Sequence, residues 1–69
     1  MSRHARNAAR RVRVPPGPVY EALREATPHD LDEAGNTRYT VIIYGERYRV
    51  IVARDDPHFI ISFHPRRKG

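Results

Sequence analysis

The chain contains no cysteine among its 69 residues, which excludes disulfide bonds and thiolate metal sites. It also lacks an apolar run as long as a signal-peptide core or a membrane span, since its start reads "SRHARNAARRVR". We therefore expect a soluble, cytoplasmic protein that does not associate with a membrane. A chain of this length allows a single domain, here residues 1–69, close to the lower size limit for one apolar core.

Acidic residues are missing from the first thirteen positions, where arginines are frequent. The basic residues of the two ends are Arg3, Arg6, Arg10, Arg11, Arg13, Arg66, Arg67 and Lys68. Most acids lie between these ends, and the formal net charge is +5. Clustered cations favour a polyanion such as RNA, because neutralising phosphates releases condensed counterions. The alternative is that twelve arginines against one lysine reflect a GC-rich genome, and that both ends are only solvated tails.

Several motifs that indicate a cofactor-binding or hydrolytic site are also missing. There is no glycine-rich phosphate loop, no nucleophile elbow and no carboxylate pair with a clear role. His58 and His64 with Asp55 and Asp56 are too loosely spaced for a metal site. We therefore expect neither a metal nor another cofactor.

Two helices are predicted at the beginning of the chain. Ser2 can cap the first helix, in which Ala5, Ala9 and Val12 follow the spacing of one apolar stripe. The segment "VPPGP" ends this helix, because proline lacks a backbone donor and restricts the residue before it. Pro18 suits the first turn of a second helix that ends near Thr27.

After the second helix the apolar residues recur at every second position, which indicates strands. "TRYTVIIYG" and "ERYRVIVAR" flank Gly45-Glu46, a two-residue loop with glycine first, as a type II′ hairpin turn prefers. This turn pairs Val41 with Val50 and keeps one face apolar. A second hairpin over 54–57 pairs Val50 with Ile61, and a short fourth strand is expected at 29–32. The helices need this apolar face, so we predict an α+β domain with two N-terminal helices packed on one face of a three- to four-stranded antiparallel sheet.

The opposite face of this sheet is polar. The predicted register places Arg49 beside Ser62 and Arg47 beside His64, with Tyr44 on the same face. Histidine can transfer protons near neutral pH, and arginine offers a planar fork that matches phosphate oxygens. Ser62 could donate to a phosphate oxygen, and Tyr44 could stack on a base. The alternative is an ordinary solvated sheet face, whose arginines discourage aggregation.

Five short segments, "SRHA", "VPPGPVYEAL", "GNTRY", "GERYRVIVARDD" and "IISFHP", together resemble the domain of unknown function 4258 family. That family is placed with the barnase, EndoU, colicin and RelE-like group of small ribonuclease folds. The resemblance implies a helical layer on an antiparallel sheet. It also implies relatives that act as metal-independent ribonucleases or as toxins of toxin–antitoxin systems, so that an antitoxin protein would be a partner.

The resemblance also implies roles for particular residues. The family's early histidine falls on His4, and the small hydroxyl residue of its last strand falls on Ser62. A tyrosine near the end of that strand is replaced by His64. The arginine late in the first helix falls on Val12, between Arg11 and Arg13.

We therefore predict a toxin-like protein that binds RNA across the polar face and cleaves it without a metal. The expected catalytic residues are His64, Arg49, Arg47 and His4, and the expected RNA-binding residues are Ser62, Tyr44, Arg11 and Arg13. The alternative is a non-catalytic nucleic-acid- or protein-binding module with the same fold, such as a phage or mobile-element accessory protein.

Overall fold

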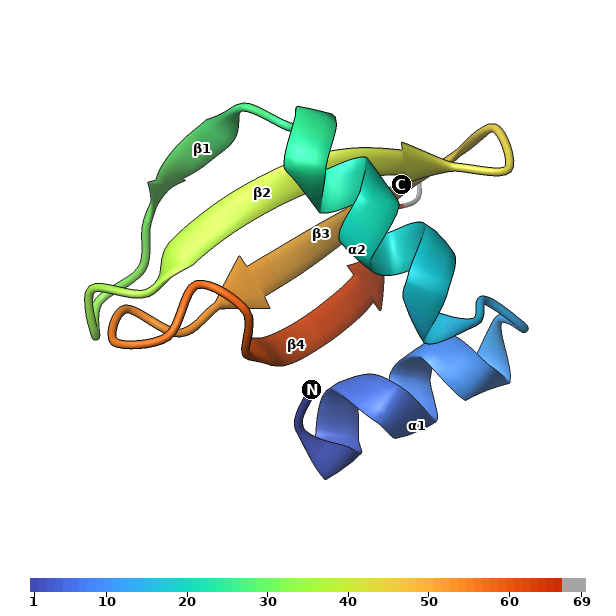
Figure 1. The fold of residues 1–69 in the computed structure, drawn as a ribbon, viewed down its shortest axis with the longest axis horizontal. Coiled ribbons are helices and arrows are strands. Elements are labelled where there is room, and N and C mark those ends of the chain that lie inside the picture. Colours follow the sequence, from blue (N-terminus) through green and yellow to red (C-terminus); the bar gives the residue numbers. More distant parts are fainter. Residues whose placement is uncertain (67–69) are drawn as a thin grey trace.

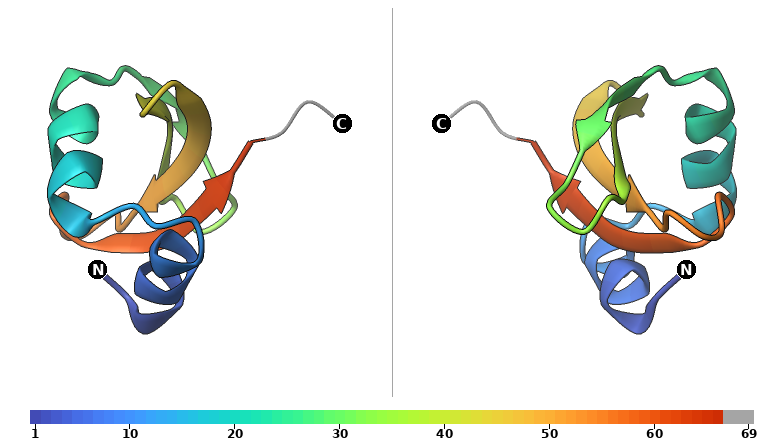
Figure 2. Two further views of the ribbon diagram at one scale, coloured as in Figure 1. Left: turned by 90° about the vertical axis from the view of Figure 1, so that its right-hand side faces the viewer. Right: turned by 90° about the vertical axis from the view of Figure 1, so that its left-hand side faces the viewer.

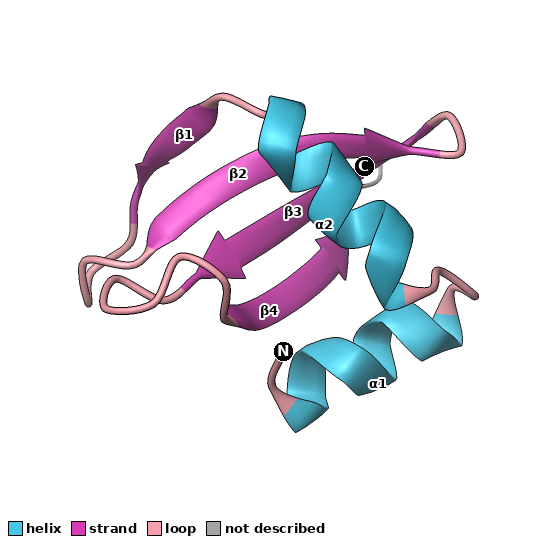
Figure 3. Ribbon diagram, viewed as in Figure 1, coloured by secondary structure: helices cyan, strands magenta, loops and turns pink. Residues whose placement is uncertain are grey.

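Two helices precede a four-stranded antiparallel sheet in the computed structural model, which describes residues 1–66. The elements are α1 (Arg3–Arg11), α2 (Pro16–Glu25), β1 (Pro28–Leu31), β2 (Thr37–Ile43), β3 (Glu46–Val52) and β4 (Ile60–Pro65). The strands lie in the sheet in chain order, as Figures 1 and 3 show. The predicted α+β class and the fourth strand are confirmed. Arg67 and Lys68, which the sequence places in a basic end, lie outside the described residues.

Helix α1 begins and ends with specific hydrogen bonds. Ser2 is its N-cap, as predicted, and the Ser2 side chain accepts a hydrogen bond from the Ala5 N–H at 3.0 Å. At the other end the Val14 N–H donates to the Ala9 carbonyl, and the Arg13 N–H donates to the Arg10 carbonyl. This is a Schellman motif, in which the left-handed position normally holds glycine. Arg13 occupies that position here, with φ of 61°.

The two helices contact different parts of the sheet. Helix α2 starts at Pro16, buries Val19 and packs against β2, whereas α1 packs against β4. Figure 2 shows α2 facing the concave side of the curved sheet and α1 running beside β4. Neither helix is long and apolar enough to cross a membrane, in the part of the chain that the structure describes.

The core forms between the helices and the concave face. Its buried residues are Ala5, Ala9, Val14, Val19, Val41, Ile43, Tyr48, Val50, Val52, Ile60 and Phe63. Phe63 is fully buried, and its ring stacks on Tyr48 with the centroids 4.8 Å apart. The predicted apolar face of β2 and β3 is therefore the one that is buried, whereas in β4 Ile60 is buried in place of the predicted Ile61.

The turn between β2 and β3 differs from the prediction. Ile43 faces Glu46, so the two turn residues are Tyr44 and Gly45, and not Gly45 and Glu46. Tyr44 and Gly45 have φ of 53° and 78°, which makes the turn type I′ and not type II′. Every pairing in this hairpin is displaced by two positions from the predicted register. A displacement of two keeps each side chain on its face, which is why the core is unaffected.

The predicted pairs between β3 and β4 are also wrong. Arg49 lies opposite His64 and not opposite Ser62, which faces Ile51. Arg47 lies nearer the beginning of β3, beyond the last pair with β4, and its carbonyl accepts a hydrogen bond from the Arg66 N–H at 2.8 Å.

Two local features account for this displacement. The Ala53 N–H donates to the Phe59 carbonyl, so the loop is one residue longer than predicted. Val52 then pairs with Ile60, and the register shifts before the next pair, which leaves Ile61 as an extra residue. The longer loop and the bulge together move the register by two positions beyond Ile61, so Phe63 and His64 keep their predicted faces. Before the bulge the predicted face is wrong, because Ile60 is buried in the core and Phe59 is exposed.

Strand β1 is attached to β2 by an ion pair. Asp30 accepts hydrogen bonds from Arg38 Nε at 2.6 Å and from Arg38 Nη2. The hydrogen bonds from Arg38 lower the pKa of Asp30 to about 2. Arg38 is therefore neutralised within the fold, unlike the arginines discussed below.

Because of this ion pair, we expect the free energy of unfolding to depend on pH in the acidic range. Because the pKa of Asp30 is lower in the folded chain, its stabilisation is complete above its ordinary value of 3.8 and is lost as the pH falls toward about 2. We expect Asp30→Asn to flatten the decline in the free energy of unfolding across this range, as measured by urea titrations at several pH values. Parallel declines in the wild type and the variant would contradict this assignment.

Candidate functional site

A row of polar side chains crosses the outer, convex face of the sheet. In the observed register Thr40 of β2 faces Arg49 of β3, and Arg49 faces His64 of β4. Directly opposed residues of antiparallel strands bring their side chains into contact range. The neighbouring core residues point to the other face, because side chains alternate along a strand. Arg49 therefore lies across the strands between Thr40, which carries a hydroxyl group, and His64, which carries an imidazole.

Helix α1 adds a second histidine to this row. The ring centroids of His4 and His64 lie 5.9 Å apart, with the planes inclined at 59°. Both side chains are exposed, so both are open to a ligand. The early histidine, which the resemblance alone singled out, thus lies beside the histidine that replaces the expected tyrosine of the last strand.

Ser2 is the residue that places His4 there. The Ser2 N–H donates to the Ile60 carbonyl at 2.7 Å, and its hydroxyl donates to the Ile61 carbonyl. The same hydroxyl accepts from the Ala5 N–H and so caps α1. The start of the helix is therefore fixed to the free edge of β4, two residues before His4.

Replacing Ser2 tests this arrangement. We expect Ser2→Ala to lower the free energy of unfolding by about 1–2 kcal/mol, since the cap and the bond to Ile61 are both lost. The nuclear Overhauser contacts between His4 and His64 should weaken in the same variant. Ser2→Thr keeps the hydroxyl and is the control; equal stability of the two variants would show that the hydroxyl does not hold the helix.

A basic pocket lies next to His64, since Pro65 lines it. It has a volume of about 570 Å³ and forms where the end of α1 meets the beginning of β3 and the end of β4. Its described lining comprises Arg11, Val12, Glu46, Arg47, Tyr48, Pro65 and Arg66. Glu46 is the only acid among these residues. Two predicted site residues, Arg11 and Arg47, are thus brought together here.

The remaining predicted residues lie elsewhere. Tyr44 is 71 % exposed at the tip of the β2–β3 turn. Ser62 is half-buried opposite Ile51, two residues before His64 on the same face. Arg13 lines a different pocket, between the helices. The structure therefore does not join Ser62 or Arg13 to the histidine pair.

Sequence reasoning missed two residues of this region. Thr40 belongs to the row because it faces Arg49, and Arg66 belongs to the basic pocket. Alternation along β2 could have identified Thr40 if the turn at Tyr44 and Gly45 had been recognised. The position of Arg66 depends on the end of β4, which follows from the loop and bulge.

The charges of the fold are separated along the strands. The ion pairs within residues 1–66 are His29–Asp30, Arg38–Asp30 and Arg54–Asp55. All of them lie toward the end of the sheet that carries the β1–β2 and β3–β4 loops (Figure 1). We call this the acidic end, and its exposed acids include Glu33, Asp55 and Asp56. The opposite, basic end carries Arg11, Arg47 and Arg66.

The arginines near the histidine pair are available to a ligand. Neither Arg47 nor Arg49 forms an ion pair or a side-chain hydrogen bond in the described part of the chain. Their charges can therefore be neutralised by a bound anion. Phosphate is well matched, because the guanidinium fork can donate two parallel hydrogen bonds to its oxygens.

No protein-family model, curated protein or solved structure matches the chain. Within residues 1–66 no three histidine or acidic side chains gather so as to hold a metal ion. The site consists of two adjacent imidazoles, the arginine Arg49 on strand β3, and a cationic pocket.

Proposed function

We propose that the protein is a toxin-like endoribonuclease that binds RNA across the outer face of the sheet and cleaves it without a metal. The observation that carries this proposal is the pair His4 and His64, with Arg49 directly opposite His64 in the sheet. Two groups able to transfer protons and one fixed cation are the parts that RNA transesterification needs.

The chemistry can be assigned to these side chains. One neutral imidazole takes the proton of a ribose 2′-hydroxyl, whose oxygen forms a bond to the neighbouring phosphorus. The bond from phosphorus to the 5′-oxygen breaks, and the other histidine, protonated, gives its proton to that oxygen. Arg49 stabilises the additional negative charge on the phosphorane. The products are a 2′,3′-cyclic phosphate and a free 5′-hydroxyl, with one proton taken up and one released.

The surroundings of the pair provide a path for the RNA. Arg11, Arg47 and Arg66 of the basic pocket can contact the phosphates that flank the scissile one. Tyr44 is exposed at the same end of the sheet, where it can stack on an unpaired base. The resemblance to small ribonuclease toxins supports the same reaction, with an antitoxin protein as partner and the cytoplasm as the place of action.

Incubation of the purified protein with total RNA in EDTA tests the proposal. Fragments that end in 2′,3′-cyclic phosphate are expected, with a bell-shaped dependence of kcat/KM on pH because one group must be neutral and one protonated. RNA that stays intact over the whole pH range would show that the protein is not a metal-independent ribonuclease.

A second candidate is a non-catalytic nucleic-acid-binding module, such as a phage or mobile-element accessory protein. It is favoured by the exposure of both histidine side chains to water. Such a protein would bind RNA with an affinity that falls steeply with salt, yet leave the RNA intact. The same incubation, followed by a binding titration at two salt concentrations, separates the two candidates.

A further inference from the structure

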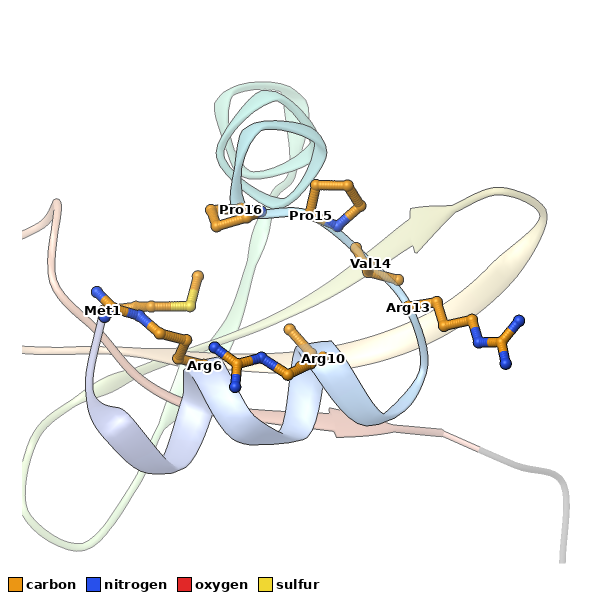
Figure 4. A pocket seen from close by; sticks show the side chains of 8 residues that line it. Met1, Arg6, Arg10, Arg13, Val14, Pro15 and Pro16 are labelled. Atoms are coloured by element: carbon orange, nitrogen blue, oxygen red, sulfur yellow. The ribbon is translucent and has the colours of Figure 1, made fainter.

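A second pocket, the interhelix pocket, lies between α1 and α2 and has no part in the proposed cleavage. Its volume is about 440 Å³. Its lining comprises Met1, Arg6, Ala9, Arg10, Arg13, Val14, Pro15 and Pro16, shown in Figure 4. Residues four apart on a helix share a face, so Arg6 and Arg10 lie together, whereas His4 and Arg11 lie on another face of α1. The pocket is thus separate from the histidine pair.

The walls of the interhelix pocket are aliphatic and rigid. Val14 is held by the hydrogen bond from its N–H to the Ala9 carbonyl, and Pro15 and Pro16 have fixed φ angles. The amino group of Met1 lies 3.5 Å from the Tyr20 hydroxyl of α2, which holds the start of the chain over the pocket. A ligand would therefore enter a preformed apolar site and would not have to order it.

Arginines lie at both ends of these apolar walls. In Figure 4, Arg6 and Arg10 extend toward Met1, and Arg13 extends in the opposite direction. No acid lines the pocket, and none of the three forms an ion pair within residues 1–66. Arg13 also stands where the backbone is left-handed, although glycine would avoid a cost of about 1 kcal/mol there.

The lining of the interhelix pocket indicates which kind of anionic ligand it would bind. Sites for unpaired nucleic acid combine cations with aromatic platforms on which bases stack. The described lining of the interhelix pocket has no aromatic residue, and its walls are methyl, methylene and pyrrolidine groups. Such walls fit an aliphatic side chain. Cations on both sides of an aliphatic site are complementary to a peptide that carries carboxylates on both sides of a leucine-like residue.

We propose that the interhelix pocket binds an acidic amphipathic segment of a partner protein. An aliphatic side chain of that segment enters the space between Val14 and the prolines. Its carboxylates pair with Arg6 and Arg10 at one end and with Arg13 at the other. Because this face of α1 does not carry His4, the segment and an RNA bind the protein at the same time.

A peptide titration with matched charge reversals tests this proposal. The probe is a fluorescein-labelled acidic peptide in which leucines recur at helical spacing between Asp and Glu. The full chain carrying Arg6→Glu and Arg10→Glu is compared with one carrying Arg3→Glu and Arg24→Glu. All four positions are exposed on helices, so the net charge changes equally and only the first pair lines the pocket. Circular dichroism establishes that both variants are folded.

We expect the Arg6 and Arg10 reversal to weaken peptide binding at least about tenfold more than the control reversal, with the loss measured by fluorescence anisotropy. A peptide in which serine replaces the leucines should bind the wild-type protein as weakly as the leucine peptide binds the Arg6 and Arg10 variant. His64→Ala should bind the peptide as the wild type does, so this test is independent of cleavage. Equal loss in the two double variants, tight binding of the serine peptide, or displacement of the peptide by an RNA oligonucleotide would each overturn the proposal.

Discussion

Replacing His64 with alanine is expected to slow RNA cleavage by roughly 10²–10⁴-fold, the usual contribution of a positioned general acid or base. Folding should be nearly unchanged, because the His64 side chain is exposed. Affinity for RNA should also change little, since the arginines of the basic end remain. Single-turnover cleavage, circular dichroism and a binding titration measure the three quantities separately.

Histidines outside the pair provide the control for this experiment. His58 is exposed in the β3–β4 loop at the acidic end, so His58→Ala should cleave at the wild-type rate. His4→Ala should lose about as much activity as His64→Ala, and the double variant should lose little more, since the two groups act as one unit. An unchanged rate for His64→Ala, or an equal loss for His58→Ala, would refute the assignment of the pair.

Replacing Phe63 with alanine is expected to lower the free energy of unfolding by about 3–5 kcal/mol. The Phe63 side chain is completely buried, and its ring stacks on Tyr48. A domain of this size has a total stability of only about 3–10 kcal/mol, so the variant should be largely unfolded without a stabilising additive. Urea titration followed by circular dichroism measures the change.

Phe59 offers a matched control of the same residue type. It is 40 % exposed in the loop before β4, so Phe59→Ala should cost much less than Phe63→Ala. Similar losses for the two variants would show that the core does not depend on the stack between Phe63 and Tyr48. Because Phe63 precedes His64 in β4, the same burial also fixes the direction in which His64 points.

The faces of β2 and β3 could be predicted from sequence, but the pairs could not. Alternation along these two strands determines which side chains are buried, and any even displacement of register leaves this result intact. In β4 the bulge breaks the alternation, so Ile60 is buried instead of the predicted Ile61. The sequence pattern does not decide whether the turn residues are Tyr44 and Gly45 or Gly45 and Glu46. Tyr44 takes a left-handed conformation that asparagine or glycine more often occupies, so the type I′ turn was not the obvious one. The extra residue Ile61 has no signature in the sequence pattern either.

The candidate site was predictable only in part for a related reason. Alternation placed Arg47, Arg49 and His64 on one face, and this is what the structure has. The approach of His4 depends on hydrogen bonds between Ser2 and the edge of β4, which join distant parts of the chain. No local pattern encodes such a contact.

The separation of the charges between the two ends of the sheet has a kinetic consequence. A molecule with a basic end and an acidic end has a large electric dipole, and a polyanion exerts a torque on it before contact. The approaching strand is repelled from Glu33, Asp55 and Asp56 and turned toward Arg47. Encounters are thereby enriched in orientations that present the histidine pair, and this advantage should fade as added salt shortens the Debye length.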